Sequence, residues 1–269
     1  MPAVDQIQAA LPEFGCLQVV APVDHAGTVE ALQNAYAFNQ LLDSHIRAVN
    51  HDYYSPQQVL QMVDGWAPDI ACVAAEFDIP PELLAGTMAL EADLDYHWTD
   101  AIFDGLVVSP LGGIFSHVEV GAAFAGVHFR HLKPALRQLG RDFSGSTFYQ
   151  HYYDLIVSTS DADLTVLSTR YRLIDLADAA IMARHYAQLR MGTHRLSEMT
   201  ITDMAFTWSA YRGGVVNTSA DLQDDHRWSL DYLQRAENPQ DFGDTLLALP
   251  YFRYFRQFYA QNLAFTTVR

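Results

Sequence analysis

Apolar residues recur at helical spacing along most of the chain. Between residues 27 and 50 they fall about every 3.6 residues, at Val29, Leu32, Tyr36 and further positions, as on one face of an amphipathic helix. The same spacing predicts further helices, which cover residues 56–78, 81–95, 128–139, 163–191, 198–211 and 249–265. The last of these carries a dense aromatic stripe, which indicates a C-terminal helix docked on the core.

Capping and helix-breaking residues mark several of these boundaries. Ser55 followed by Pro56 is typical of an N-cap with proline at the first helical position. Pro68 predicts a break in that helix, because proline lacks the amide hydrogen that helix pairing needs. Gly140 is placed to end the helix before it, as a glycine in the left-handed conformation does.

Two stretches interrupt the helical pattern. Residues 105–126 are rich in Gly, Ser and β-branched residues and predict a loop with a short hairpin, whereas residues 141–160 predict a loop or short helix. No repeat and no Pro/Gly/Ser linker divides the chain. We therefore expect one compact, mainly α unit, with residues 1–70 as a helical extension packed on a core of residues 71–269.

The composition argues against several classes of protein. Half of the 269 residues are hydrophobic and 18% are charged, which favours a globular protein over a disordered one. There are 16 basic and 32 acidic residues, for a formal net charge of −16. This balance argues against general nucleic-acid binding and against docking on anionic lipid, since both need basic surface.

The cysteines and the N-terminal residues bear on the compartment. Cys16 and Cys72 have no metal-site spacing, and we expect two free, buried thiols in a reducing compartment. The first residues, MPAVDQIQAALPEFGC, lack the features of a signal peptide, and no stretch of 18 apolar residues predicts a membrane span. We therefore expect synthesis in the cytoplasm, with any export needing a dedicated system.

One carboxylate falls on an apolar helix face. Glu91 lies three residues after Met88 and seven after Leu84, on the stripe that should face the core. Burial there would raise its pKa and keep it protonated, as a general acid for glycoside cleavage requires. The alternative is that Glu91 sits at the edge of the stripe and pairs with an arginine.

Further acidic residues follow Glu91 closely and are candidates for a second carboxylate. They are Asp93, Asp95, Asp100, Asp104 and Glu119. The alternative is that they form a solvated acidic loop. His128 and His131 lie three residues apart, but without a recognised zinc motif we expect no metal site and no cofactor.

Three segments, in order, resemble the lysozyme-like superfamily, in particular soluble lytic transglycosylases and goose-type lysozymes. AEFDIPPELLAGTMALEADLD (75–95) is similar to the family's catalytic helix, with Glu91 at the position of the catalytic glutamate. GAAFAGVHFRHLKPAL (121–136) is similar to its Gly-rich segment. SAYRGG (209–214) resembles its tyrosine motif and places Tyr211 at the cleft. The match covers roughly residues 70–215.

This resemblance implies a lysozyme-like helical domain with a Gly-rich loop or hairpin and extra terminal helices. It implies a peptidoglycan-cleaving muramidase or lytic transglycosylase, with Glu91 as general acid/base, Tyr211 beside the reacting centre, and Asp95 or Asp104 as the second carboxylate of a hydrolase. The residues implied to bind the glycan are Ser116, His117, Gly126, His128 and Arg212. A phage or secretion system would have to deliver such an enzyme to the wall, so a carrier protein is a candidate partner.

Departures from the family pattern leave other functions open. Ala92 follows the glutamate in place of serine, Gly126 replaces a glutamine, and Arg212 replaces an asparagine. The latter two family residues help to bind the acetamido group of the sugar. The alternatives are therefore a catalytically silent module that binds a glycan or a protein, and an all-helical interaction protein in which the motif order is accidental.

Overall fold

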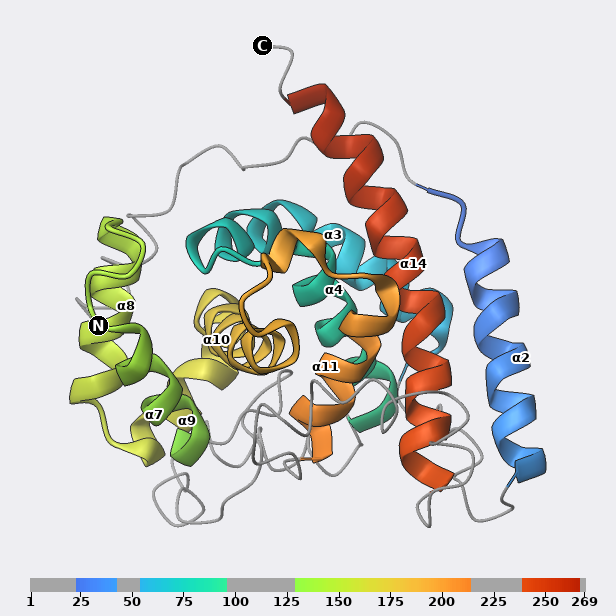
Figure 1. Ribbon diagram of the computed structural model, residues 1–269, viewed down its shortest axis with the longest axis horizontal. Helices are drawn as coiled ribbons and strands as arrows, with labels where there is room; N and C mark the ends of the chain where they lie inside the picture. Colours follow the sequence, from blue (N-terminus) through green and yellow to red (C-terminus); the bar gives the residue numbers. More distant parts are fainter. Residues whose placement is uncertain (1–22, 43–53, 96–128, 214–238, 267–269) are drawn as a thin grey trace.

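The computed structural model describes residues 23–42, 54–95, 129–213 and 239–266, and all regular elements in these ranges are helical (Figure 1). They are α2 (Ala26–Leu42), α3 (Pro56–Glu76), α4 (Pro81–Leu90), η1 (Glu91–Asp95), α7 (Phe129–Leu139), α8 (Thr147–Ser158), α9 (Asp161–Arg170), α10 (Arg172–Met191), η2 (Leu196–Glu198), α11 (Ile201–Gly213) and α14 (Pro239–Thr266). The mainly α prediction is confirmed. The predicted hairpin in residues 105–126 lies outside the described ranges.

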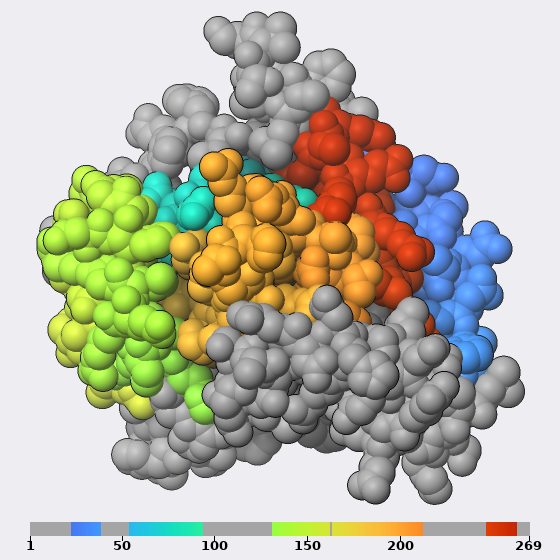
Figure 2. All heavy atoms as spheres, in the orientation of Figure 1, coloured from blue at the N-terminus to red at the C-terminus, as the bar shows by residue number. Residues whose placement is uncertain are grey.

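Helix α10 lies in the middle of the described helices and contacts α3, α4, α7, α9 and α11 (Figure 1). On one side of it lie α7, α8 and α9. On the other, α14 packs on α4 and α11, and its outer face carries α2. The space-filling view shows α2 at the edge of the molecule, beyond α14 (Figure 2).

Helix α4 is enclosed by its neighbours and is buried all round from Leu83 to Leu90, as a helix at the centre of a core should be. The apolar stripe expected from the sequence therefore extends over the whole surface of α4. Gly86 faces α14 so closely that an added Cβ would lie 2.3 Å from two ring atoms of Phe252. The glycine thus permits the close approach of these two helices.

Two boundary predictions need correction. Pro68 does not break α3, because buried residues on both sides, Ala67 and Ile70, hold the helix in place against the local cost of the proline. The single helix expected at 163–191 divides at Tyr171, whose backbone is extended (φ −126°, ψ 100°), into α9 and α10. Of the loop or short helix expected at 141–160, the structure shows the short helix, since α8 has 12 residues and is capped by Ser146.

Other predictions at the helix ends are confirmed. Ser55 caps α3 and accepts a hydrogen bond from the backbone of Gln58. Gly140 has φ +80°, the left-handed conformation expected after a helix. The aromatic residues of α14 form a buried stripe, which comprises Tyr251, Phe252, Tyr254, Phe255, Phe258 and Tyr259.

The prediction of two free thiols is wrong. Cys72, on α3, is disulfide-bonded, and the other cysteine of the sequence, Cys16, lies outside the described residues. Sequence spacing could not show this pairing, because two cysteines far apart in a chain can meet in the fold. The proposed domain boundary at residue 70 falls inside α3. Among the described helices, none is long and apolar enough to cross a membrane.

Candidate functional site

Glu91 lies where α4 changes into the π-helical turn η1. Its side chain is buried, with 4% of the residue's surface exposed. The indole Nε1 of Trp208, on α11, donates a hydrogen bond of 3.0 Å to Glu91 Oε1. Single π-helical turns occur often at functional sites, where they turn a side chain away from regular helical register. The structure thus places the predicted glutamate in the core, where its carboxyl accepts a hydrogen bond from a helix distant in sequence.

Asp93 anchors the same turn. Its Oδ2 accepts hydrogen bonds from the hydroxyls of Tyr36, on α2, and Tyr251, on α14, the second at 2.7 Å. Burial and the negative charge of Asp93 raise the pKa of Tyr251 well above its usual value, so this hydroxyl keeps its proton. Asp93 is 6% exposed, and the interpretation as a solvated acidic loop is therefore wrong for this residue.

Tyr211 lies one helical turn after Trp208 on α11, so the two side chains share a helix face. Its half-buried ring meets that of Tyr186, on α10, edge to face at 6.3 Å. The predicted tyrosine and the partner of the predicted glutamate therefore come from the same surface of one helix. Sequence reasoning missed Trp208, although a buried tryptophan usually needs an acceptor for its N–H, which was the available signal.

The remaining predicted site residues are not placed beside Glu91 by the described structure. Asp95 lies in η1 and Arg212 in α11, but their side chains are outside the described part of the molecule. Five further predicted residues lie wholly outside the described ranges, namely Asp104, Ser116, His117, Gly126 and His128. Their roles stay predictions.

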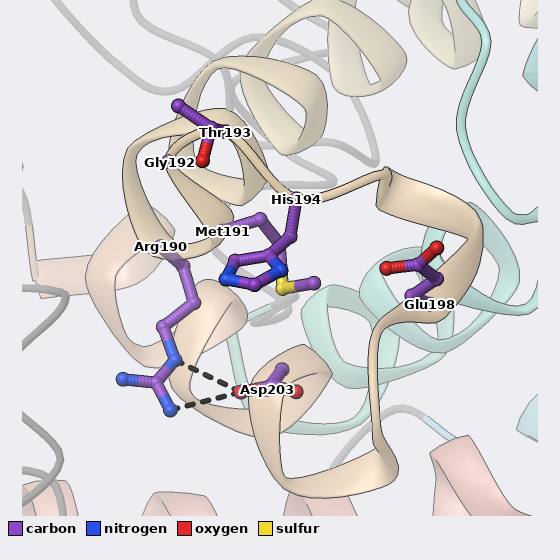
Figure 3. Close-up of a pocket in the computed structure, with 7 residues that line it drawn as sticks. All are labelled: Arg190, Met191, Gly192, Thr193, His194, Glu198 and Asp203. Carbon is purple, nitrogen blue, oxygen red and sulfur yellow. Dashed lines mark hydrogen bonds and ion pairs between the residues drawn. The ribbon is translucent and has the colours of Figure 1, made fainter.

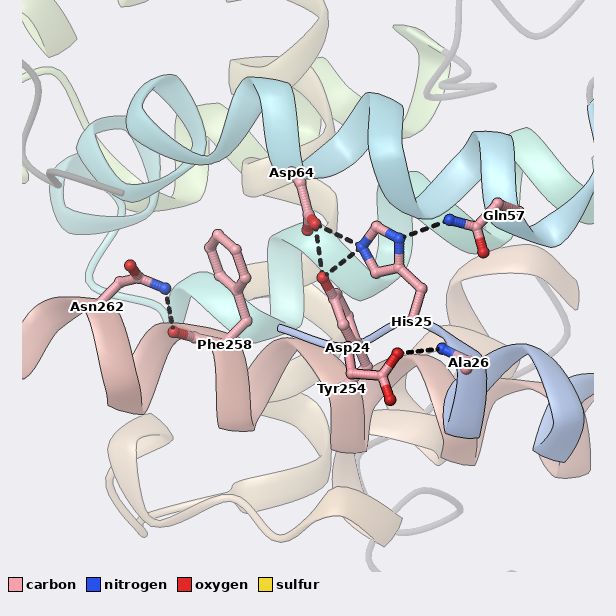
Figure 4. A network of polar contacts seen from close by, with 8 residues as sticks. All are labelled: Asp24, His25, Ala26, Gln57, Asp64, Tyr254, Phe258 and Asn262. Atoms are coloured by element: carbon pink, nitrogen blue, oxygen red, sulfur yellow. Dashed lines mark hydrogen bonds and ion pairs between the residues drawn. The ribbon is translucent and has the colours of Figure 1, made fainter. Parts of the chain in front are cut away.

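A second polar cluster, unforeseen from the sequence, ties α2 to α3 and α14 (Figure 4). Asp64 Oδ2 accepts from the Tyr254 hydroxyl at 2.5 Å and lies 2.8 Å from His25 Nε2. The amide nitrogen of Gln57 donates to His25 Nδ1 at 2.8 Å, so Nε2 carries the ring proton and donates to Asp64. Burial raises the pKa of Asp64, although the bonds from Tyr254 and His25 oppose this. This cluster links the N-terminal end of α2 to α3 and α14.

Another buried carboxyl, on α10, joins this helix to α8 and α9. Asp178 is 1% exposed and accepts hydrogen bonds from the hydroxyls of Tyr152, on α8, and Ser168, on α9, the second at 2.5 Å. Burial raises its pKa to about 7, although both hydrogen bonds work against that change. Asp178 therefore titrates near neutral pH. Its hydrogen bonds link α10 to α8 and α9.

This raised pKa predicts a pH-dependent stability. Because the folded-state pKa exceeds the unfolded value, the protonated form stabilises the fold fully below about pH 4, and this contribution is lost as the pH rises to about 7. The loss amounts to roughly 4 kcal/mol at about 1.4 kcal/mol per pKa unit. Asp178→Asn should remove this part of the pH dependence, as denaturant unfolding from pH 4 to pH 8 would show. The exposed Asp142→Asn is the control and should keep it; equal curves for Asp178→Asn and wild type would contradict the prediction.

A pocket of about 530 Å³ lies at the end of α10 and the start of α11 (Figure 3). Its lining comprises Arg190, Met191, Gly192, Thr193, His194, Glu198 and Asp203. It opens at the N-terminal end of α11, whereas Trp208 and Tyr211 lie in the C-terminal half of that helix. The pocket is therefore separate from the surroundings of Glu91.

Glu91 and its donor Trp208 can support proton transfer, since a buried carboxyl with a fixed donor suits general acid–base chemistry. No protein-family model, no curated protein and no solved structure matches the chain. The resemblance to the lysozyme-like superfamily therefore rests on the sequence motifs alone.

Proposed function

We propose that this protein cleaves an amino-sugar glycan of the peptidoglycan type, with Glu91 as general acid/base. The observation that carries the proposal is the burial of Glu91 at the end of α4, with Trp208 donating to its carboxyl. Removal of a carboxyl from bulk water favours its protonated form, which is the form in which a general acid for glycoside cleavage acts.

In this mechanism Glu91 protonates the glycosidic oxygen of the leaving sugar. The resulting carboxylate keeps the hydrogen bond from Trp208 and then accepts a proton from the attacking hydroxyl. In a lytic transglycosylase that hydroxyl belongs to the muramoyl residue itself, whereas in a hydrolase a second carboxylate assists water. Asp95 and Asp104 stay the candidates for that role. Asp93, with its two tyrosine donors, instead fixes the turn that carries Glu91.

The second candidate is a silent module that binds the glycan without cleaving it. The exposed fraction of Glu91, only 4%, favours this candidate, because a sugar must reach the acid that protonates it. The replaced glutamine and asparagine of the family motifs, at Gly126 and Arg212, favour it as well.

Incubation of the pure protein with insoluble peptidoglycan separates the two candidates. Cleavage releases soluble fragments, whereas a silent module sediments with the glycan and releases none. Release above that of heat-denatured protein supports the enzyme. Neither release nor co-sedimentation, on walls of both major types, would contradict both candidates.

Trp208→Phe should lower the rate of release about tenfold, because it removes a hydrogen bond to a group that becomes charged during the reaction. Without this donor the carboxylate is less stable, so the basic limb of the pH–rate profile should move to higher pH. Trp66→Phe on α3 is the matched control, since the half-buried Trp66 packs under Arg172 instead. An unchanged profile in Trp208→Phe would rule out this role for Trp208.

A further inference from the structure

The pocket between α10 and α11 has the size and position of a small-molecule site. Its volume of about 530 Å³ falls within the usual range for such pockets, roughly 300–1,000 Å³. The chain from the end of α10 through α11 lies at the molecular surface in Figure 2, so a ligand can reach the pocket. Figure 3 shows the ring of His194 between Arg190 and Glu198, above the paired Arg190 and Asp203. We call His194 and Glu198 the walls of the pocket and the Arg190–Asp203 pair its floor.

The floor of the pocket is an ion pair held by further hydrogen bonds. Arg190 donates to Asp203 Oδ1 at 2.9 Å, and the backbone and hydroxyl of Thr200 donate to Asp203 Oδ2 at 2.9 and 2.7 Å. Burial alone would raise the pKa of Asp203, but these bonds outweigh it and lower the pKa, so Asp203 is ionised beside Arg190. Arg190 also lies over the ring of Phe206, at 5.5 Å. The charges of Arg190 and Asp203 on the floor of the pocket therefore neutralise each other.

His194 and Glu198, on the walls of the pocket, carry hydrogen-bond acceptors that do not bond to the Arg190–Asp203 pair. Within the described part of the chain, the side chains of His194 and Glu198 are exposed and make no hydrogen bond or ion pair. Among the lining residues, Glu198 is therefore the uncompensated charge, and it is negative. Met191 and the methylene stem of Arg190 add apolar surface to the same space.

We propose that this pocket binds an alkylammonium group, with the ammonium on Glu198 and His194 and the aliphatic chain against Met191. An ammonium has three hydrogen-bond donors and no acceptor, which suits a carboxylate oxygen and an imidazole nitrogen, both of which can accept. The formal charge of −16 on the whole chain raises the local concentration of cations. The group could come from a free polyamine or from a lysine side chain of another protein. This site is independent of the proposed glycan cleavage.

A titration followed by NMR tests the proposal. In the full chain with ¹³C-methyl methionine, the Met191 signal is assigned with Met191→Leu. Putrescine and Nα-acetyl-lysine amide are the probes, and butane-1,4-diol is the uncharged control. We expect a saturable shift of the Met191 methyl with at least one amine and none with the diol. Glu198→Gln should weaken binding about tenfold, whereas Glu30→Gln, which removes an exposed charge on α2, should leave it unchanged.

The two amines distinguish the sources of the ligand. Binding of putrescine alone indicates a free polyamine, and binding of the lysine derivative alone indicates a protein side chain. No saturable shift with either amine would overturn the proposal. An equal loss of affinity in Glu30→Gln and Glu198→Gln would also overturn it, because it would show attraction by net charge without a site.

Discussion

Glu91→Gln should lower the rate of glycan cleavage at least about 100-fold and leave the melting temperature nearly unchanged. General acid–base catalysis contributes roughly 10²–10⁴ to a rate, and glutamine cannot donate a proton to a leaving oxygen. Glutamine retains an oxygen that can accept the 3.0 Å hydrogen bond from Trp208, so the core around it should persist. The measurement is the initial rate of soluble fragment release, with thermal unfolding of both proteins alongside.

The matched control is Glu82→Gln, the same substitution on the same helix. Glu82 pairs with Arg256 at 3.3 Å and lies in the first turn of α4, at the opposite end from Glu91. A partly exposed ion pair contributes little to stability, so this variant should keep both fold and activity. Equal loss of activity in the two variants would show a general effect of altering α4 and would remove the special role of Glu91.

Gly86→Ala should destabilise the fold by roughly 1–3 kcal/mol, the usual cost of overpacking a core. The new methyl group would lie 2.3 Å from the ring of Phe252, which is fully buried and has no space to retreat. Either α14 must move away from α4 or the ring must leave its rotamer. At roughly 2–4 °C per kcal/mol, the melting temperature should fall by several degrees.

Gly65→Ala on α3 is the control for this substitution. An added Cβ there meets nothing within 4 Å, so the higher helix propensity of alanine should stabilise the protein by up to about 1 kcal/mol. Opposite signs for the two variants would support the close approach of α4 and α14. A stabilised Gly86→Ala protein would show that Phe252 does not pack on this glycine.

Local patterns predicted most of the helices. The 3.6-residue spacing and the caps at Ser55 and Gly140 reflect interactions within a few residues, which sequence reasoning can follow. Glu91 was found in the same way, as a charge in an apolar run. The structural reason for glycine at position 86 lies in Phe252, a residue far along the chain.

What the sequence could not reveal depends on distant partners. Asp93 looked like part of a solvated loop because its donors, Tyr36 and Tyr251, come from opposite ends of the chain. Pro68 looked like a break because the packing that holds α3 is not visible in local sequence. The disulfide of Cys72 was missed for the same reason, and it weakens the argument for a reducing compartment, since disulfides persist mainly in oxidising ones.

Mass spectrometry of the products from purified sacculi tests the central claim most directly. Wild type and Glu91→Gln are incubated with the same sacculi, and the soluble muropeptides are compared. We predict muropeptides with new glycan ends for wild type, either anhydro or reducing, and none above background for Glu91→Gln. Anhydro ends would identify a lytic transglycosylase, and reducing ends a hydrolase. The same products in the same amounts from a folded Glu91→Gln protein would contradict the role of Glu91 as general acid.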